Sequence, residues 1–270
     1  MTFLGLIEGY TFGKVVDAVC AVGKTWAQHY YQEYYPIVKG KMNENINKFA
    51  HILRIKLKSD ESTIIKEKAD KQMVKPLFAM TLREAVVSAA LTDDEEKHKI
   101  LADIITDLIA GQMSSEKESI FEIVSRMACE NIKNLTSKQL NILGLIKFIR
   151  MDVPSEREKY CLGDTEFAGW YSNLIHVSEK FFPLELIEED LLHLESVSCV
   201  RRDSVVYADK TGLHASLRAD KYGWNYNQFL EADSTGRKLK VLWEKGGVGL
   251  NLITLTTLGQ LIGSYVKCEL

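Results

Sequence analysis

The chain has 270 residues, of which 46% are hydrophobic and 26% charged, and its formal net charge at pH 7 is -3. This length allows a substantial core without disulfides, and this charge excludes a whole-chain attraction to phosphate. The five cysteines include no C-x-x-C pair, which excludes a zinc knuckle and a thioredoxin-type motif, so we expect reduced, buried thiols and a cytoplasmic protein.

The first segment, residues 3–27, is apolar but is interrupted by Glu8, Lys14, Asp17 and Lys24. Each charge costs about 2.5–3.5 kcal/mol near the centre of a bilayer, so we expect neither a membrane span nor a secretion signal. Glycines at the i, i+4, i+8 spacing would line one helix face with small residues, and these are candidate self-association residues: Gly5, Gly9 and Gly13. A loop or an irregular helix start is the alternative at these glycines, and association of residues 3–27 with a membrane surface is a further expectation.

Residues 37–75 hold ten basic and five acidic residues and form the one notable basic region of the sequence. Apolar residues recur at helical spacing, so we expect an amphipathic helix whose inward stripe is Ile46, Phe49, Ile52, Leu53 and Leu57. The lysines then occupy its solvated face. The alternative is a face that contacts nucleic acid or an acidic surface, for which the candidates are Lys48, Arg54, Lys56 and Lys58.

Residues 76–153 are expected to form a helical bundle. A first helix covers Leu77 to Leu91, and a second begins behind Asp93, which with Glu96 resembles a capping box, and ends at Gly111. A third covers Glu118 to Asn131, and a fourth begins behind Thr136 or Ser137. The inward residues expected in the third helix are Ile120, Phe121, Val124, Met127 and Ala128.

Residues 154–270 change in texture and are expected to form a winged-helix-like module with a small antiparallel sheet. The predicted helices are Thr165 to Ser178, Leu184 to Ser196, and Leu258 to Val266 behind Thr256 or Thr257. The predicted strands are Ser198 to Tyr207, Leu239 to Trp243 and Leu250 to Thr254, with a hairpin turn at Gly246, Gly247 and Gly249. The expected fold class is therefore mainly α (α+β), with an N-terminal amphipathic segment at 1–75 before the bundle at 76–153 and the module at 154–270.

Four sequence runs resemble the bacterial abortive-infection alpha proteins and their uncharacterised relatives. They are KPLFAMTLREAVVSAALTDDEEKHKILADIITDLIAG with NIKNLTSKQLNILGLI, and LLHLESVSCVRR with LITLTTLGQLIG. The resemblance covers residues 75–150 and 191–266, and its motifs are structural rather than catalytic. It implies a role in protection against phage, by growth arrest or death of the infected cell.

No motif in the sequence predicts a catalytic, metal or cofactor site. The six histidines are scattered without a metal-ligand spacing, and the glycines at 246–249 match no phosphate-binding loop. The helix expected to enter a DNA groove, Leu184 to Ser196, has no Lys or Arg, so phosphate would repel it. Its five acids are Glu185, Glu188, Glu189, Asp190 and Glu195.

The leading interpretation is a non-enzymatic, defence-associated protein that acts through a protein partner or through homo-oligomerisation. The alternative is a nucleic-acid-binding regulator that uses the basic stretch at 37–75.

Overall fold

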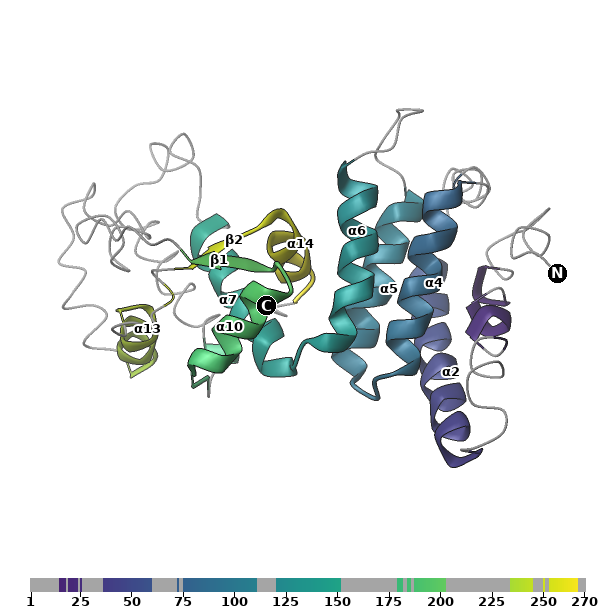
Figure 1. Cartoon of the computed structure of the whole chain (residues 1–270), viewed down its shortest axis with the longest axis horizontal. Coiled ribbons are helices and arrows are strands. Elements are labelled where there is room, and N and C mark those ends of the chain that lie inside the picture. The colour runs from purple at the N-terminus through teal and green to yellow at the C-terminus, as the bar shows by residue number, and fades with distance from the viewer. Residues whose placement is uncertain are drawn as a thin grey trace. The chain divides into compact units, whose positions relative to one another are not determined.

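The computed structural model describes residues 15–17, 19–23, 25, 36–59, 72, 75–110, 120–151, 179–181, 184–185, 187–202, 234–244, 250 and 253–266. These residues are mostly helical and hold one two-stranded antiparallel sheet, which confirms the mainly α class with a small sheet (Figure 1). Contacts divide the chain into two compact units, Met1–Leu135 and Thr136–Leu270. Within the described part of the chain, no helix has both the length and the apolar character that crossing a membrane requires.

The first unit is a helical bundle that ends at Leu135, so the fourth helix expected in the bundle at 76–153 falls in the second unit. Its helices are α2 (Pro36–Ser59), α4 (Pro76–Ala90), α5 (Glu95–Ala110) and α6 (Ile120–Asn131), followed by the 3-10 turn η2 (Ile132–Asn134). Helix α4 packs against α6, and α2 lies along both α4 and α5 (Figure 1). The amphipathic helix expected in the basic segment therefore belongs to the same unit as the bundle.

The interior of this unit is filled by aliphatic stripes at helical spacing. On α2, Phe49, Leu53 and Leu57 are buried together with Ile46, and Ile52 is half-buried. Helix α5 buries an equally regular set, namely Ile100, Leu101, Ile104, Ile105, Leu108 and Ile109. Each fully buried side chain of this size contributes about 1.5–3 kcal/mol, so these stripes dominate the stability of the bundle.

Two predictions about the bundle are wrong in detail. Ile120 was expected to face inward but is 75% exposed. Lys75, immediately before α4, forms an ion pair with Glu122, so α4 begins beside Glu122. Ile120 lies beyond this point, where α4 does not cover it. The cap of α5 is Asp94 rather than Asp93, because Asp94 Oδ1 accepts hydrogen bonds from the backbone N–H groups of Glu96 and Lys97.

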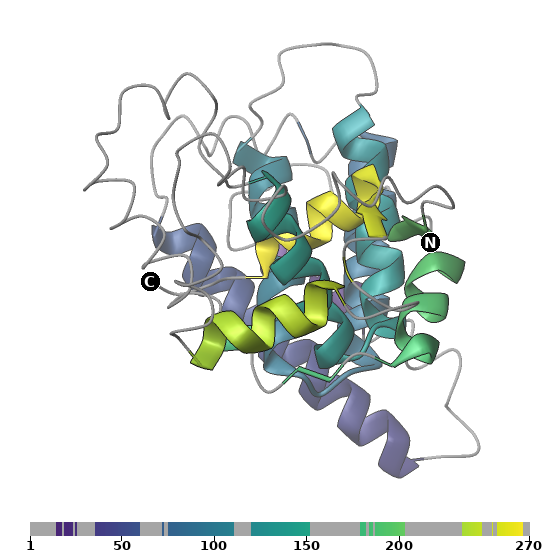
Figure 2. The ribbon, with the colours of Figure 1, turned by 90° about the vertical axis from the view of Figure 1, so that its left-hand side faces the viewer.

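The second unit contains α7 (Ser137–Met151), η3 (Glu179–Phe181), α10 (Glu188–Ser196), β1 (Val200–Arg202), α13 (Ser234–Glu244), β2 (Ile253–Leu255) and α14 (Thr257–Tyr265). Figure 2 shows this unit turned toward the viewer. Helix α14 packs closely on α7, where a Cβ added at Gly263 would lie 2.8 Å from the carbonyl oxygen of Leu143. Strand β1 pairs with β2 in antiparallel register, with Val200 opposite Leu255 and Arg202 opposite Ile253.

The predicted caps of α7 and α14 are confirmed. Thr136 Oγ1 accepts from the backbone N–H of Gln139 at 3.2 Å, and Gln139 Oε1 accepts from the backbone N–H of Thr136 at 3.0 Å. This reciprocal pair is a complete capping box. At α14, Thr256 Oγ1 accepts from the backbone N–H of Gly259 at 3.1 Å.

The strand predicted at Leu239 to Trp243 is wrong, because this segment lies in helix α13. Thr235, Leu239 and Leu242 are buried at the i, i+4, i+7 spacing of one helix face, whereas Val241 is 65% exposed. Alternating Leu239, Val241 and Trp243 imitate a strand over a short window. The hairpin turn predicted at Gly246, Gly247 and Gly249 lies outside the described residues, as does the helix predicted at 165–178.

Helix α10 is shorter than predicted, because Ile187 is already extended, and it ends in a tight turn that leads into β1. The backbone N–H of Cys199 donates to the carbonyl of Leu194, and that of Ser198 donates to the carbonyl of Glu195, each at 2.9 Å. Ser198 has φ 59°, so it occupies the left-handed position where glycine is usually found.

Candidate functional site

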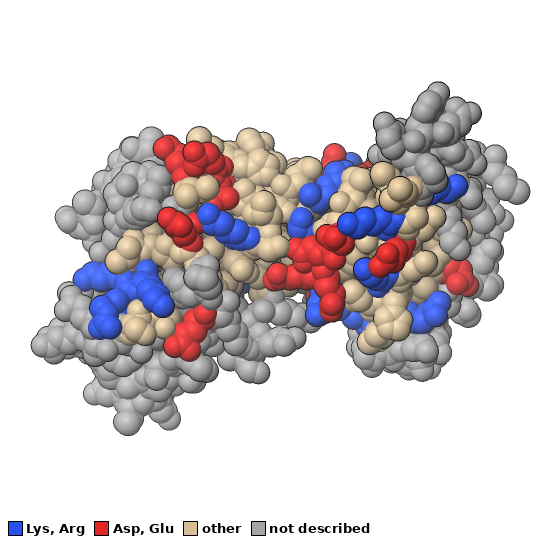
Figure 3. Space-filling view, turned by 90° about the horizontal axis from the view of Figure 1, so that it is seen from below, with Lys and Arg blue, Asp and Glu red and all other residues tan. Residues whose placement is uncertain are grey.

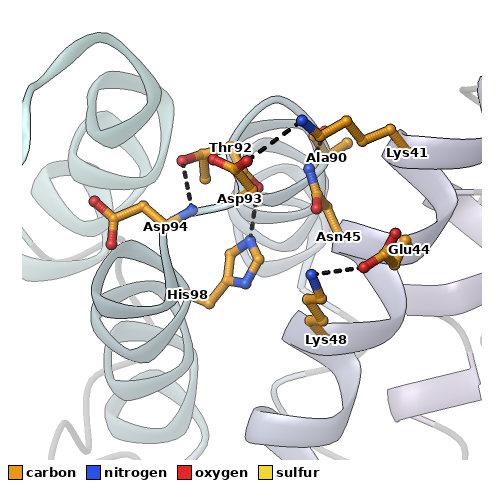
Figure 4. A network of polar contacts seen from close by, with 9 residues as sticks. All are labelled: Lys41, Glu44, Asn45, Lys48, Ala90, Thr92, Asp93, Asp94 and His98. Carbon is orange, nitrogen blue, oxygen red and sulfur yellow. Dashed lines mark hydrogen bonds and ion pairs between the residues drawn. The ribbon is translucent and has the colours of Figure 1, made fainter. Parts of the chain in front are cut away.

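A cluster of polar side chains lies where α2 passes the turn between α4 and α5 (Figure 4). At its centre is His98 of α5, which is fully buried. Its Nε2 lies 3.1 Å from the carbonyl oxygen of Ala89 and 3.0 Å from that of Thr92. Since both neighbours only accept, Nε2 carries the proton and donates to them.

The other ring nitrogen of His98 explains why the ring stays neutral. Nδ1 is buried without a hydrogen-bond partner, so a second proton there would place an uncompensated charge in the interior. Burial accordingly lowers the pKa of His98, and this outweighs the two carbonyl contacts, which favour the charged ring. The ring of Phe49 lies beside it, with the ring centroids 6.3 Å apart.

Asn45 completes the cluster from α2. Its Nδ2 donates to the carbonyl oxygen of Ala90 at 3.3 Å, and only 4% of the residue is exposed. Because the last carbonyls of an α-helix have no partner within the helix, Asn45 and His98 supply the hydrogen bonds that the end of α4 lacks. The two side chains thus tie α2 and α5 to the same turn.

Two exposed ion pairs lie beside the cluster. Lys41 Nζ is 3.4 Å from Asp93 Oδ2, and Lys48 Nζ is 2.7 Å from Glu44 Oε1 (Figure 4). The hydrogen bond from Lys41 lowers the pKa of Asp93, and that from Lys48 lowers the pKa of Glu44. Exposed ion pairs of this kind contribute little to stability, so the buried hydrogen bonds are the main polar contacts that stabilise the turn between α4 and α5.

The chemistry of this cluster is structural. Its strongest donor, His98 Nε2–H, is occupied by two carbonyls, and the carboxylate of Asp94 is occupied by the start of α5. In the described part of the chain, no group of three or more His, Cys, Asp or Glu side chains could hold a metal ion.

A second buried network lies in the other unit. Gln139 Nε2 donates to Asp190 Oδ1 at 3.3 Å, and His193 Nδ1 lies 3.2 Å from Gln139 Oε1. Lys138 Nζ forms an ion pair with Asp190 Oδ2 at 2.6 Å. The network joins the start of α7 to α10. Asp190 is therefore buried, although the sequence predicted it on the acidic face of the helix.

The candidate basic residues differ in exposure and in ion pairing. Lys48 is paired with Glu44, and Lys56 is ion-paired with Asp103 of α5 and mostly buried. Arg54 is exposed, and Lys58 belongs to α2 with a side chain outside the described part. The candidate self-association residues Gly5, Gly9 and Gly13 also lie outside the described residues.

The acids of α10 are divided between the surface and internal contacts. Glu185, just before α10, and Glu189 are exposed; Glu188 is exposed too, but it also contacts Arg202, with Oε1 3.4 Å from the guanidinium Nη1. Arg202 also lies 4.0 Å from Glu195. Arg202 of β1 thus contacts an acid at the start of α10 and another near its end, in addition to the backbone turn that joins α10 to β1.

Sequence reasoning missed both buried networks. Each had a signal: Asn45 is a polar residue on the inward side of an apolar stripe, and Gln139 occupies the fourth position of a capping box. The sequence did not reveal the hydrogen-bond partners of Asn45 and Gln139, because Ala90 and Asp190 lie far from them along the chain.

The fold and these clusters define a mainly helical protein whose helices are joined by buried bonds from side chains to helix ends and to one another. The chain belongs to a protein family of unknown function, whose sequence model matches residues 13–219, more than half of the chain. No curated protein and no solved structure shows a significant match to it.

Proposed function

We propose that the chain is a non-enzymatic protein that works through protein–protein contacts, including contacts between its own copies. The observation that carries this proposal is the contrast between its polar and its apolar side chains. Asn45, His98 and Gln139 form hydrogen bonds within the fold, whereas large apolar side chains stand on the outer faces of several helices.

Those outer apolar residues occur in both units. In the first unit Ile37 is 87% exposed, Ile120 75% and Ile55 55%, and in the second Val241 is 65% exposed. Scattered surface hydrophobes are normal, but side chains exposed to this degree gain most from a partner that removes them from water.

The resemblance to abortive-infection alpha proteins supports a defence role for these contacts, in which the protein arrests or kills a phage-infected cell. In this proposal the second unit is a winged-helix-like module that contacts protein rather than DNA. The exposed glutamates of α10 support protein contact, because they would repel a phosphate backbone.

A plaque assay tests the defence role. Bacteria that express the chain are expected to give fewer phage plaques than bacteria that express the Ile120→Asp variant, at equal protein levels. Equal plaque numbers for the chain, the variant and an empty vector, over a panel of unrelated phages, would contradict it.

The alternative is a nucleic-acid-binding regulator that uses the exposed Arg54 and Lys48 of α2. It predicts binding to a DNA duplex that falls steeply with salt concentration and is weakened by Arg54→Ala. The ion pairs of Lys48 and Lys56 weigh against it, since both cations already have a carboxylate partner.

A further inference from the structure

Two helices of the second unit carry its exposed large apolar side chains. Among the described residues of this unit, these side chains are Leu192 on α10, Ile187 at the start of α10, and Val241 on α13. Their exposed fractions are 49%, 43% and 65%, respectively. No other described element of the unit presents such a residue to solvent.

The same two helices carry opposite charges in the same layout. On α10, exposed Glu188, which also contacts Arg202, and exposed Glu189 precede Leu192. On α13, exposed Arg237 and Lys238 precede Val241. In both helices the two charges and the apolar residue stand at positions 0, 1 and 4, so they share one outward face. One face is therefore the acidic counterpart of the other.

Both faces are accessible from the same side of the unit. Figure 3 shows acidic side chains gathered over α10 and, apart from them, basic side chains gathered over α13. A self-complementary surface requires both patches on the same side. A twofold axis between them then places the acidic patch of each copy against the basic patch of the other.

We propose that α10 of one copy packs against α13 of a second copy of this chain, and the reverse, to form a twofold dimer of the second units. With the two helices parallel, Leu192 covers Val241 while Glu188 and Glu189 face Arg237 and Lys238. This inference rests on the proposed self-association and names the surface that performs it.

A nucleic acid fits this surface less well. The basic residues span about one helical turn, whereas a nucleic acid continues past them and meets the glutamates of α10 on the same side. A compact acidic helix with an apolar residue at its centre matches both the charge and the exposed Val241.

The experiment measures the mass of the full chain by sedimentation from about 1 to about 100 μM, a range that covers ordinary reversible dimers. The acidic face is reversed by Glu188→Lys with Glu189→Lys, and the basic face by Arg237→Glu with Lys238→Glu. Matched controls reverse exposed charges of the first unit, Arg83→Glu and Glu130→Lys. Circular dichroism checks that each variant is folded.

We expect the native chain to dimerise and each reversed face to weaken dimerisation by about 100-fold, because like charges then oppose each other. Mixing the two reversed variants should restore a dimer, since their faces are again complementary. Leu192→Ser and Val241→Ser, both at exposed positions that do not threaten the fold, should each weaken the dimer, and the controls should leave it unchanged.

Three results would overturn the inference, and they differ in whether they also refute the self-association proposed above. A native dimer that survives both face reversals and both serine variants refutes this interface but leaves self-association standing. A native chain that stays monomeric over the whole range refutes the self-association proposed above as well. A reversed pair that fails to recombine although both variants are folded also refutes the twofold pairing.

Discussion

Replacing Gly259 by alanine should destabilise the second unit, although alanine is the better helix former. A Cβ at this position would lie 1.9 Å from the carbonyl oxygen of Cys199, against an ordinary carbon–oxygen contact of about 3.3 Å or more. The obstacle is backbone, so no side-chain rotation relieves it. Overpacking of this kind costs about 1–3 kcal/mol.

The same displacement would disturb two hydrogen bonds. The Cys199 carbonyl accepts from the backbone N–H and from Oγ1 of Thr256, each at 3.1 Å. Losing one of them adds about 1 kcal/mol, and the better helix propensity of alanine returns about 1 kcal/mol. The expected net loss in free energy of unfolding is therefore about 1–3 kcal/mol.

Urea denaturation measures this loss, with hydrogen exchange in α14 to assign it to the second unit. Gly40→Ala is the matched control, because a Cβ at Gly40 on the exposed side of α2 meets nothing within 4 Å. That variant should gain about 0.5–1 kcal/mol. If Gly259→Ala were as stable as the native chain, the close approach of α14 to Cys199 would be wrong.

Three further predictions concern buried and capping groups. Burial lowers the pKa of His98 below the ordinary 6.5, so the unfolded chain takes up the proton first as the pH falls. The free energy of unfolding, relative to His98→Gln, should thus be constant above pH 6.5 and fall below it, by at most about 1.4 kcal/mol per pH unit; a flat difference between pH 4.5 and 7.5 would contradict this. Ser198→Gly should raise the melting temperature, because glycine adopts the positive φ of this turn without the cost of about 1–2 kcal/mol that other residues incur, and an unchanged or lower value would argue against that turn. Thr136→Ala should reduce the free energy of unfolding by about 1 kcal/mol through loss of the α7 cap, whereas Thr136→Ser, which keeps the capping hydroxyl, should not; equal losses in urea denaturation would contradict the cap.

The sequence predicted the elements whose signal is local. The stripe from Ile46 to Leu57 and the caps at Thr136 and Thr256 depend on residues three or four positions apart, and all are found in the fold. The strand error arose because the sequence window considered was too short. Leu239 to Trp243 alternates like a strand, but the buried Thr235 outside that window reveals the helix period.

The polar clusters were beyond the reach of sequence patterns. Asn45 and His98 bond to neighbouring carbonyls because α2 and α5 both pass the end of α4, and neither residue stands at a spacing that predicts the other. The choice between Asp93 and Asp94 as the cap of α5 is similar. Either aspartate could cap the helix by its type and position. In the structure Asp93 forms an ion pair with Lys41 of α2, and Asp94 accepts from the first backbone N–H groups of α5.

The pairing of Arg202 with Ile253 has a consequence for how this protein can change. The chain leaves the sheet after Arg202 and rejoins it at Ile253, so α13 belongs to a segment that begins and ends at adjacent points. The entropy of closing such a segment grows only slowly with its length. Insertions, deletions or exchange of this segment can therefore alter what α13 presents to a neighbour while the sheet, α7 and α14 keep their packing.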